Sequence, residues 1–283
     1  MGGRSPACVP VPEAPVRQTF QMNSDDLLWR HVRELPAFRA LLRAVEARFY
    51  QPLLPLAEPV LDIGCGDGHF ASVAFPAPLA AGIDPDIRAL REAHKREAYY
   101  LLVQARGDRL PFPGERFVTV ISNSVLEHIP DIEMVLAEVA RVLVPGGRFI
   151  FCVPSERFGK LLFFPRLFRR LGLESLARAY ERYFNRISRH HHCNTQEVWQ
   201  SRLAQADLIL TESFCYFSER AHHALDLGHY LGVPSLIAKK LFGRWILAPT
   251  RLNLYLTERW LRPLYEEPLP EEGAYLFLIV RKA

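Results

Sequence analysis

Three glycines at alternate positions mark the part of the sequence that is best suited to hold a ligand. Gly64, Gly66 and Gly68 lie in VLDIGCGDGHFA, directly after a short apolar run and before a predicted helix. Glycine adopts turns that other residues disfavour, and it lets a ligand approach the main chain closely. In a parallel α/β sheet, such a turn lies at the carboxyl end of a strand, where ligands bind. The turn therefore predicts a nucleotide or nucleoside site.

The carboxylates around this turn indicate which kind of ligand it holds. A dinucleotide fingerprint requires glycine or alanine where this sequence has His69. Asp62 and Asp67 flank the turn and would repel a pyrophosphate at the helix N-terminus. They would attract a cationic nucleoside without phosphates, such as S-adenosylmethionine (SAM), which carries an ammonium and a sulfonium. Asp84, about twenty residues further on, can accept hydrogen bonds from both ribose hydroxyls.

The elements that must position these residues are short apolar runs that alternate with helical segments. The expected strands are Val60–Ile63, Ala80–Asp84, Tyr99–Val103, Phe117–Ser122, Gly147–Val153 and Leu208–Phe217, with a last strand in GAYLFLIVRKA. The expected helices between them are Gly68–Ala74, Asp86–Glu97 and Asp131–Leu143, and two further helices divided by Pro36 precede the first strand. Buried runs separated by helices predict parallel βαβ units, and hence a doubly wound α/β sheet.

Four motifs between Pro59 and Ser155 resemble those of class I SAM-dependent methyltransferases, within the small-molecule group that includes the ubiquinone and menaquinone methyltransferases. The motifs are VLDIGCGDG, GIDPD, LPFPGERFVTVISNSVLEHIPD and EVARVLVPGGRFIFCVPS. The resemblance implies a Rossmann-like, mostly parallel, seven-stranded sheet whose final hairpin strand runs antiparallel. It also implies that SAM is the cofactor.

The resemblance further implies roles for individual residues. The glycine turn would shape the methionine pocket, Asp84 would hold the ribose, Leu110 would lie near the adenine, and Ser122 and Asn123 would face the methionine end. The expected cofactor-binding residues are Asp62, Gly64, Cys65, Gly66, Gly68, Asp84, Pro85, Asp108, Leu110, Ser122 and Asn123.

One position departs from the pattern of the family. Where the family usually has an aspartate, four residues before Leu110, this chain has Arg106. Either Asp108 accepts a hydrogen bond from the adenine amino group after a shift of the loop, or packing and backbone contacts alone hold the adenine.

Four histidines are candidates for a catalytic general base. His128 follows the fourth predicted strand and so faces the cofactor end of the sheet, although it could instead serve only to fix its loop. His190, His191 and His192 precede a helix that we expect to be capped by Asn194, and their alternative role is that of a solvated or locally bonded loop. Consecutive residues of an extended loop point in alternating directions, so these three predict no metal site by themselves.

Two segments, at about 155–193 and 218–273, interrupt the alternation and are predicted to be helical insertions that form a substrate lid. They belong to a single domain that spans residues 23–283. Between Glu156 and Arg189 there are nine basic and three acidic residues, whereas the net charge of the whole chain is only +4. Such basic amphipathic helices either pack on the core, lie on a membrane surface or clamp an anionic, partly apolar substrate.

Composition excludes several other classes of protein. Residues 1–22 are rich in proline and small residues and predict a disordered leader. No apolar run approaches the ~18 residues of a membrane span, and five scattered cysteines argue against a disulfide framework. We therefore expect a cytoplasmic protein, either soluble or peripheral at a membrane. The motif NSVL after the fourth strand differs from the NPPY type of base-modifying enzymes, which argues against a nucleic-acid partner.

The sequence thus predicts methyl transfer from SAM to an O, N or C nucleophile of a hydrophobic or amphipathic small molecule. Because the sulfonium is already activated, the protein mainly has to hold the acceptor in line with the methyl group. A general base is needed only if the acceptor loses a proton in the transition state. Two alternatives stay open: a non-catalytic SAM-binding scaffold or sensor, and an aminopropyl transferase that uses decarboxylated SAM.

Overall fold

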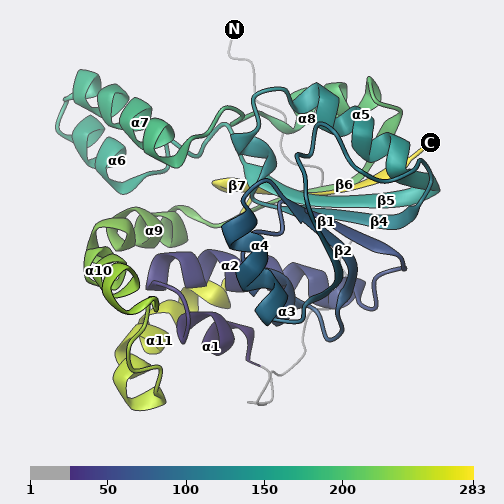
Figure 1. Ribbon diagram of the computed structural model, residues 1–283. Coiled ribbons are helices and arrows are strands. Elements are labelled where there is room, and N and C mark those ends of the chain that lie inside the picture. The colour runs from purple at the N-terminus through teal and green to yellow at the C-terminus, as the bar shows by residue number, and fades with distance from the viewer. Residues whose placement is uncertain (1–25) are drawn as a thin grey trace, which may run out of the picture.

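A seven-stranded sheet with the order β3-β2-β1-β4-β5-β7-β6 forms the centre of the molecule (Figure 1). The computed structural model describes residues 26–283, so the predicted leader at 1–22 lies outside the described residues. The strands are β1 (Val60–Ile63), β2 (Leu79–Asp84), β3 (Tyr99–Gln104), β4 (Phe117–Asn123), β5 (Leu143–Pro154), β6 (Leu208–Tyr216) and β7 (Tyr275–Lys282). β1 to β5 pair in parallel, and β7 runs antiparallel between β5 and β6. The predicted fold class and the antiparallel final strand are confirmed.

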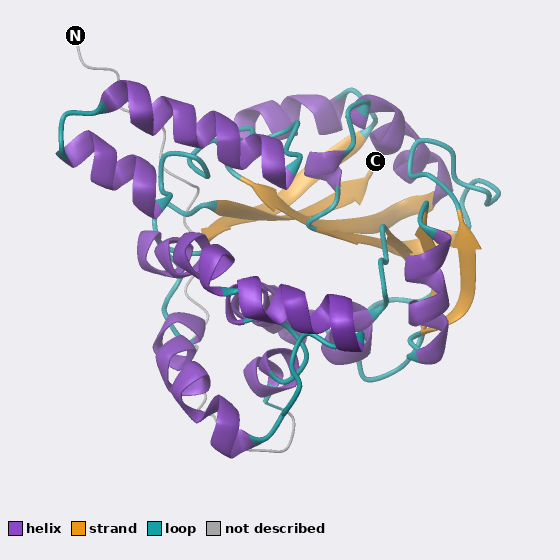
Figure 2. Ribbon diagram, turned by 60° about the vertical axis from the view of Figure 1, so that its left-hand side comes forward, coloured by secondary structure: helices purple, strands orange, loops and turns teal. Residues whose placement is uncertain are grey.

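Helices cover both faces of this sheet, so the domain has three layers (Figure 2). The helices of the sheet domain are α1 (Leu27–Val32), α2 (Ala37–Tyr50), α3 (His69–Ala74), α4 (Ile87–Lys95), α5 (Ile132–Val142) and α8 (Gln196–Ala204), with the 3-10 turns η1 (Gln51–Leu53) and η2 (Leu126–His128). One apolar core lies between the sheet and α1 to α4, and a second lies between the sheet and α5 and α8. Two cores on opposite faces explain why the parallel strands have apolar residues on both sides.

Two local predictions about helix starts have different outcomes. Pro36 is the N-cap of α2 and separates it from α1, as predicted. The cap predicted at Asn194 is wrong, because Thr195 caps α8 by accepting a hydrogen bond from the backbone N–H of Val198. Asn194 instead forms an isolated bridge with Ser155, which joins the two ends of the first insertion.

Both insertions leave the sheet at the carboxyl ends of strands and lie on the left of Figure 1. The hairpin of α6 (Phe163–Arg170) and α7 (Glu174–Ser188) follows β5, and α9 (Glu219–Leu231), α10 (Val233–Phe242) and α11 (Arg251–Tyr265) follow β6. The carboxyl edge of the sheet is therefore the edge next to the insertions. Among residues 26–283, no helix combines the length and the apolar character that crossing a membrane requires.

Candidate functional site

The turn between β1 and α3 is shaped by its glycines. Gly64, Gly66 and Gly68 all have positive φ, at 76°, 56° and 71°. Gly64 is also required for steric reasons, because a Cβ at this position would lie 2.4 Å from Cγ1 of Val125. The N–H of Gly64 donates to the carbonyl oxygen of Ile83 at 2.9 Å, which fixes the turn to the end of β2. Apart from its two chain neighbours, no described residue has a heavy atom within 4 Å of where a Cβ of Gly66 would be, so the turn is open to a ligand there.

Two carboxylates lie beside this turn in different environments. Asp62 is only 4% exposed, and Oδ2 accepts a hydrogen bond from the Tyr99 hydroxyl at 2.7 Å. Burial raises the pKa of Asp62 to about 7, although the bond from Tyr99 opposes this shift. Asp84 is half-buried, and its oxygens accept from the N–H groups of Gly66 at 3.0 Å and Asp86 at 2.8 Å. These bonds hold the Asp84 carboxylate at the turn with lone pairs left to accept ribose hydroxyls.

The loop after β3 contains the residues predicted to surround the adenine. Asp108 accepts from Nε of Arg106 at 3.0 Å, and this bond lowers its pKa. The Asp108 carboxylate is therefore already paired, and its role as acceptor for the adenine stays a prediction. Leu110 is buried, and its N–H donates to Glu138 on α5 at 2.7 Å. Pro85 is exposed, and its carbonyl oxygen accepts from the side chain of Gln104.

Ser122 and Asn123 at the end of β4 are engaged with protein groups. The Ser122 hydroxyl donates to the carbonyl oxygen of Ile63 at 3.0 Å and is fully buried. The Asn123 amide donates to Glu46 on α2 at 2.6 Å and accepts from the thiol of Cys152. These bonds fix the end of β4 beside the glycine turn, and a direct contact with SAM stays a prediction for both residues.

The carboxylate of Glu46 is the centre of a buried network that the sequence interpretation missed. Besides Asn123, it accepts hydrogen bonds from Arg43 at 2.8 Å, from the Ser124 hydroxyl at 2.7 Å and from the Tyr216 hydroxyl at 2.9 Å. Glu46 is fully buried, so all four donors compensate the cost of burying its charge. The network joins α2, β4 and β6 at the carboxyl edge of the sheet.

Two predicted histidines behave differently from each other at the end of the first insertion. His190 stacks on His128, with ring centroids 5.4 Å apart. His192 is buried elsewhere: Nε2 lies 2.9 Å from the carbonyl oxygen of Ile129, and Nδ1 accepts from Arg202 at 3.1 Å. Because both ring nitrogens of His192 are bonded, this residue fixes the loop. His191 is exposed, and its backbone N–H donates to the carbonyl oxygen of Glu127.

Glu127 completes a cluster with these two stacked histidines. The candidate ligand atoms of Glu127, His128 and His190 lie within 4.8 Å of one another, close enough to hold a metal ion. Nδ1 of His128 lies 3.2 Å from the carbonyl oxygen of Arg189, which leaves Nε2 as the acceptor of the neutral ring. Oε2 of Glu127 is buried without a partner among the described residues.

Burial also sets the protonation of this cluster. It raises the pKa of Glu127 to about 8 and lowers the pKa of His128. Burial, with a contribution from the neighbouring His128, lowers the pKa of His190 to about 4. At neutral pH both imidazoles are therefore neutral and able to accept a proton, while Glu127 is mostly protonated. A neutral imidazole can accept a proton, and a pKa lowered to about 4 makes His190 a weak base at neutral pH.

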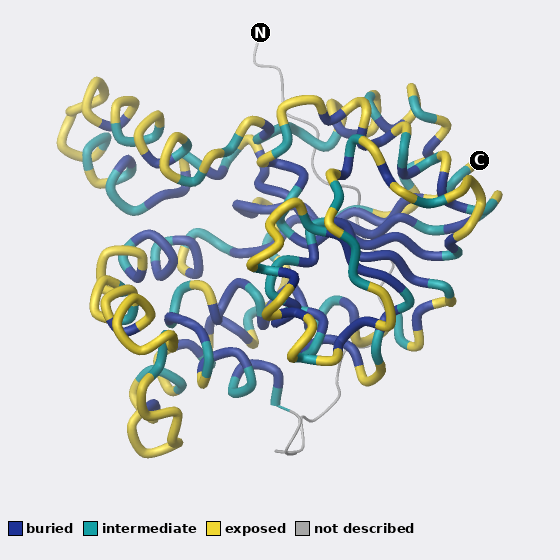
Figure 3. Tube along the Cα trace, viewed as in Figure 1, coloured by how far each residue is buried: buried dark blue, intermediate teal, exposed yellow. Residues whose placement is uncertain are grey.

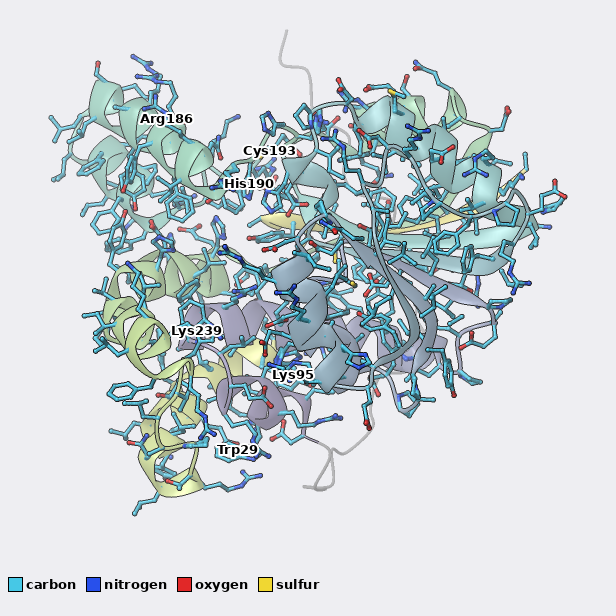
Figure 4. The ribbon with its side chains drawn as sticks, viewed as in Figure 1. Trp29, Lys95, Arg186, His190, Cys193 and Lys239 are labelled. Carbon is cyan, nitrogen blue, oxygen red and sulfur yellow. The ribbon has the colours of Figure 1, made fainter. Side chains whose placement is uncertain are left out.

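A pocket of about 510 Å³ opens at the two stacked histidines. It is lined by His128, Arg182, Asn185, Arg186, Arg189, His190 and His191. Figure 4 shows Arg186 on α7, with His190 and Cys193 on the segment that leads back to the sheet. The pocket therefore combines η2, which follows β4, with the end of the first insertion.

Residues 61–151, which contain the glycine turn, Asp84 and η2, match the family model described as a methyltransferase domain. The chain carries a methyltransferase domain. This methyltransferase domain implies SAM as the methyl donor, as predicted. The match ends at residue 151, before either insertion begins.

The relatives of the methyltransferase domain include enzymes named for quinone biosynthesis. The chain is 35% identical over 118 residues to a ubiquinone biosynthesis O-methyltransferase of Thiobacillus denitrificans. The aligned region covers 39% of this chain and 50% of the relative. The chain is 33% identical over 131 residues to a ubiquinone/menaquinone biosynthesis C-methyltransferase of Desulfotalea psychrophila. Here the aligned region covers 44% of this chain and 53% of the relative. The chain thus spans about half the length of these curated relatives.

The fold is shared with solved methyltransferases. A SAM-dependent methyltransferase from Thermotoga maritima superposes with a TM-score of 0.52 over 91% of this chain and 92% of that chain, at 18% identity. At this level of identity the likeness concerns the fold, so the acceptor has to be argued from the residues of this chain.

Proposed function

We propose that this chain transfers a methyl group from SAM to an O, N or C nucleophile of a hydrophobic or amphipathic small molecule. The observation that carries the proposal is the glycine turn with Asp62 and Asp84 inside a methyltransferase domain. The buried carboxylate of Asp62 suits an ammonium group, and Asp84 suits a ribose. When bound, SAM supplies an activated methyl group: its S–CH3 bond breaks as the nucleophile–CH3 bond forms, the sulfonium becomes a neutral thioether, and any proton of the nucleophile passes to a base or to water.

The pocket at His128 and His190 is the proposed acceptor site. Val125 packs against the glycine turn at Gly64, and His128, three residues later, lines the pocket. An acceptor in the pocket therefore lies one short loop from the cofactor turn, with two neutral imidazoles beside it. The two relatives named above differ in whether the methyl group goes to oxygen or to carbon, so the proposal leaves this atom open.

Calorimetric titration with SAM and with S-adenosylhomocysteine tests the cofactor site. Asp84→Asn should weaken SAM binding by about 1–3 kcal/mol, because a charged acceptor is lost while the shape is kept. Asp86→Asn is the matched control: Asp86 is exposed, caps α4 through the N–H of Arg88 and should leave SAM affinity within about twofold. Absence of SAM binding to the folded wild type would overturn the proposal.

Release of S-adenosylhomocysteine distinguishes an enzyme from a scaffold. The wild type is incubated with SAM and a panel of phenols, amines and enols that carry an apolar tail. We expect turnover with at least one member, because the pocket is adjacent to the cofactor turn. SAM binding without turnover on any member would contradict the acceptor class and favour the scaffold alternative.

We also propose that α10 and α11 bind the surface of an anionic phospholipid bilayer. Leu252 and Leu256, one turn apart on α11, are 91% and 76% exposed. The other large apolar residues that are more than half exposed nearby are Leu231, Val233, Ile237, Leu241, Phe242, Leu247 and Tyr255. Figure 3 shows this exposure along both helices. So many exposed apolar side chains exceed the scattered ones of an ordinary surface and indicate an interaction site.

The charges of the same region favour an anionic partner. The exposed basic residues are Lys239, Lys240, Arg244, Arg251 and Arg259, of which Arg251 pairs with Glu258. The acidic residue of this stretch, Glu258, is paired with Arg262. Basic residues around an apolar helical face are typical of helices that lie at a membrane surface.

Flotation with vesicles tests this second proposal. We expect the wild type to float with vesicles of phosphatidylcholine and phosphatidylglycerol and to float less with phosphatidylcholine alone. The double variant Leu252→Ser/Leu256→Ser should lose flotation, whereas Tyr100→Ser, which changes a 79% exposed residue on β3, should keep it. Equal flotation of both variants, or a dimer that the double variant dissociates, would overturn the membrane proposal.

A further inference from the structure

The acceptor pocket has an unusual charge pattern, because its lining contains no carboxylate. Arg182, Arg186 and Arg189 contribute guanidinium groups, and His190 and His191 contribute imidazoles. Arg182 and Arg186, four residues apart, lie on one side of α7, and Arg189, its left-handed C-cap, lines the same pocket. Three cationic groups therefore border one opening.

These three arginines also lack the ion pairs that neighbouring arginines make. On the same hairpin, Arg169 pairs with Glu181 at 2.6 Å, and Arg166 pairs with Glu219 at 2.6 Å. Within residues 26–283, no carboxylate lies in ion-pair contact with the arginines of the pocket. Unpaired guanidinium groups on the wall of a pocket create a positive field, and their planar donors match carboxylate and phosphate oxygens.

We propose that Arg182, Arg186 and Arg189 bind an oxyanion of the acceptor, either a carboxylate or a phosphate, and so make the preferred acceptor an anionic amphipathic molecule. This inference rests on the proposed function, because it takes the pocket to be the acceptor site. The bound oxyanion holds one end of the acceptor on α7. The rest of the molecule then extends past His128 and His190 towards the glycine turn, where the methyl group is transferred.

A metal ion is the competing occupant of the same region. Glu127, His128 and His190 offer ligand atoms within 4.8 Å of one another. The three arginines oppose a cation at that position and favour an anion, so the two occupants make different demands on the arginines. A variant that removes these arginines can therefore distinguish a bound anion from a bound metal ion.

The experiment titrates the full chain with benzoate and with phenyl phosphate, using benzyl alcohol as the uncharged match, and follows binding by calorimetry. We expect both anions to bind and benzyl alcohol to bind more weakly. The double variant Arg182→Gln/Arg186→Gln should lower anion affinity by about tenfold or more. Arg170→Gln is the matched control, because Arg170 is an exposed arginine of the same hairpin that does not line the pocket. It should stay within about twofold of the wild type.

The two anions distinguish the sources of the oxyanion, since the tighter one identifies the group that the acceptor carries. Equal anion affinity of the double variant and the wild type would overturn the inference. A second result would also overturn the inference: neither anion binds, whereas zinc binds, is removed by a chelator and binds the double variant as well as the wild type. Titration of the same variants with SAM separates the two levels: if SAM binds and the anions do not, only this inference fails, and if SAM does not bind the wild type, the proposed function fails.

Discussion

The cofactor edge of the sheet and the helical insertion above it are built in opposite ways. At the cofactor edge, backbone groups and short carboxylates are fixed by close contacts, such as the N–H of Gly66 on Asp84. On α7 and its C-cap, long arginine side chains border an open pocket and have no ion-pair partner among residues 26–283. The first arrangement suits a ligand that never changes. The second suits an acceptor that differs between enzymes, because residues on an outer helix can be replaced without altering the sheet.

Glycines with the same backbone angle make this contrast measurable. Gly64 at the cofactor turn has a φ of 76°, and Gly172 between α6 and α7 has a φ of 73°. A Cβ at Gly64 would collide with Val125, whereas a Cβ at Gly172 would have no atom of the described residues within 4 Å besides those of its chain neighbours. The backbone strain of an alanine is therefore similar at both positions, and the steric cost arises only at the cofactor turn.

The largest expected effect is that of Gly64→Ala. The added methyl group must displace Val125 and the start of η2, so SAM affinity should fall by about 100-fold or more, and the protein should also lose stability. Gly172→Ala should cost only about 1–2 kcal/mol of backbone strain and should leave SAM affinity unchanged. Calorimetry with SAM and urea unfolding measure the two effects. SAM binding by Gly64→Ala with wild-type affinity would contradict the packing described for the turn.

The next effect compares two ion pairs, of which Arg43–Glu46 is more deeply buried than Arg169–Glu181. Glu46→Gln leaves Arg43, whose side chain is only 18% exposed, without its counter-charge and should lower the free energy of unfolding by about 3 kcal/mol. Glu181→Gln removes the partner of Arg169 on the insertion, where solvent screens the pair, and should cost less than about 1 kcal/mol. Urea denaturation followed by circular dichroism compares both variants with the wild type. Similar losses from the two substitutions would show that the Glu46 network is no more important for folding than a surface pair.

The same division separates what the sequence could predict from what it could not. Val60–Ile63 is a strand with the predicted bounds, because an apolar run that ends in glycine is a local signal. The partners of Glu46 are not local: Asn123 is 77 residues away and Tyr216 is 170 residues away. The sequence contains one local sign of this network, which is that the carboxylate of Glu46 follows Val45 within the apolar face of a predicted helix. The cluster of Glu127 with His190 was missed for the same reason, since its members come from different elements.

The insertions show a second limit of sequence patterns. Helical spacing of apolar residues predicts an amphipathic helix, but it does not say which turns of that helix the rest of the chain will cover. Leu254 and Leu261 of α11 are buried, whereas Leu252 and Leu256 are exposed. The difference depends on where α11 contacts α1 and α2, which is a property of the tertiary structure.

The smallest expected effect concerns the pH dependence of the cofactor edge. Burial raises the pKa of Asp62 to about 7, so in the ligand-free protein its ionisation opposes folding. The pKa of Asp62 is therefore higher in the folded protein than in the unfolded chain. The stability that the protonated carboxyl contributes is complete at low pH and is lost as the pH rises through about 7. Between pH 6 and pH 8 the wild type should therefore lose about 1.4 kcal/mol of stability relative to Asp62→Asn.

Urea denaturation at pH 6, 7 and 8 measures this difference, and saturating SAM adds a second arm to the experiment. An ammonium beside Asp62 favours its ionised form, so bound SAM should stabilise the wild type more at pH 8 than at pH 6, relative to Asp62→Asn. Parallel stability curves for the wild type and Asp62→Asn without ligand would contradict the raised pKa. A pH dependence that SAM leaves unchanged would place the cationic group of the cofactor away from Asp62, and would assign Asp62 to the packing of Tyr99 instead.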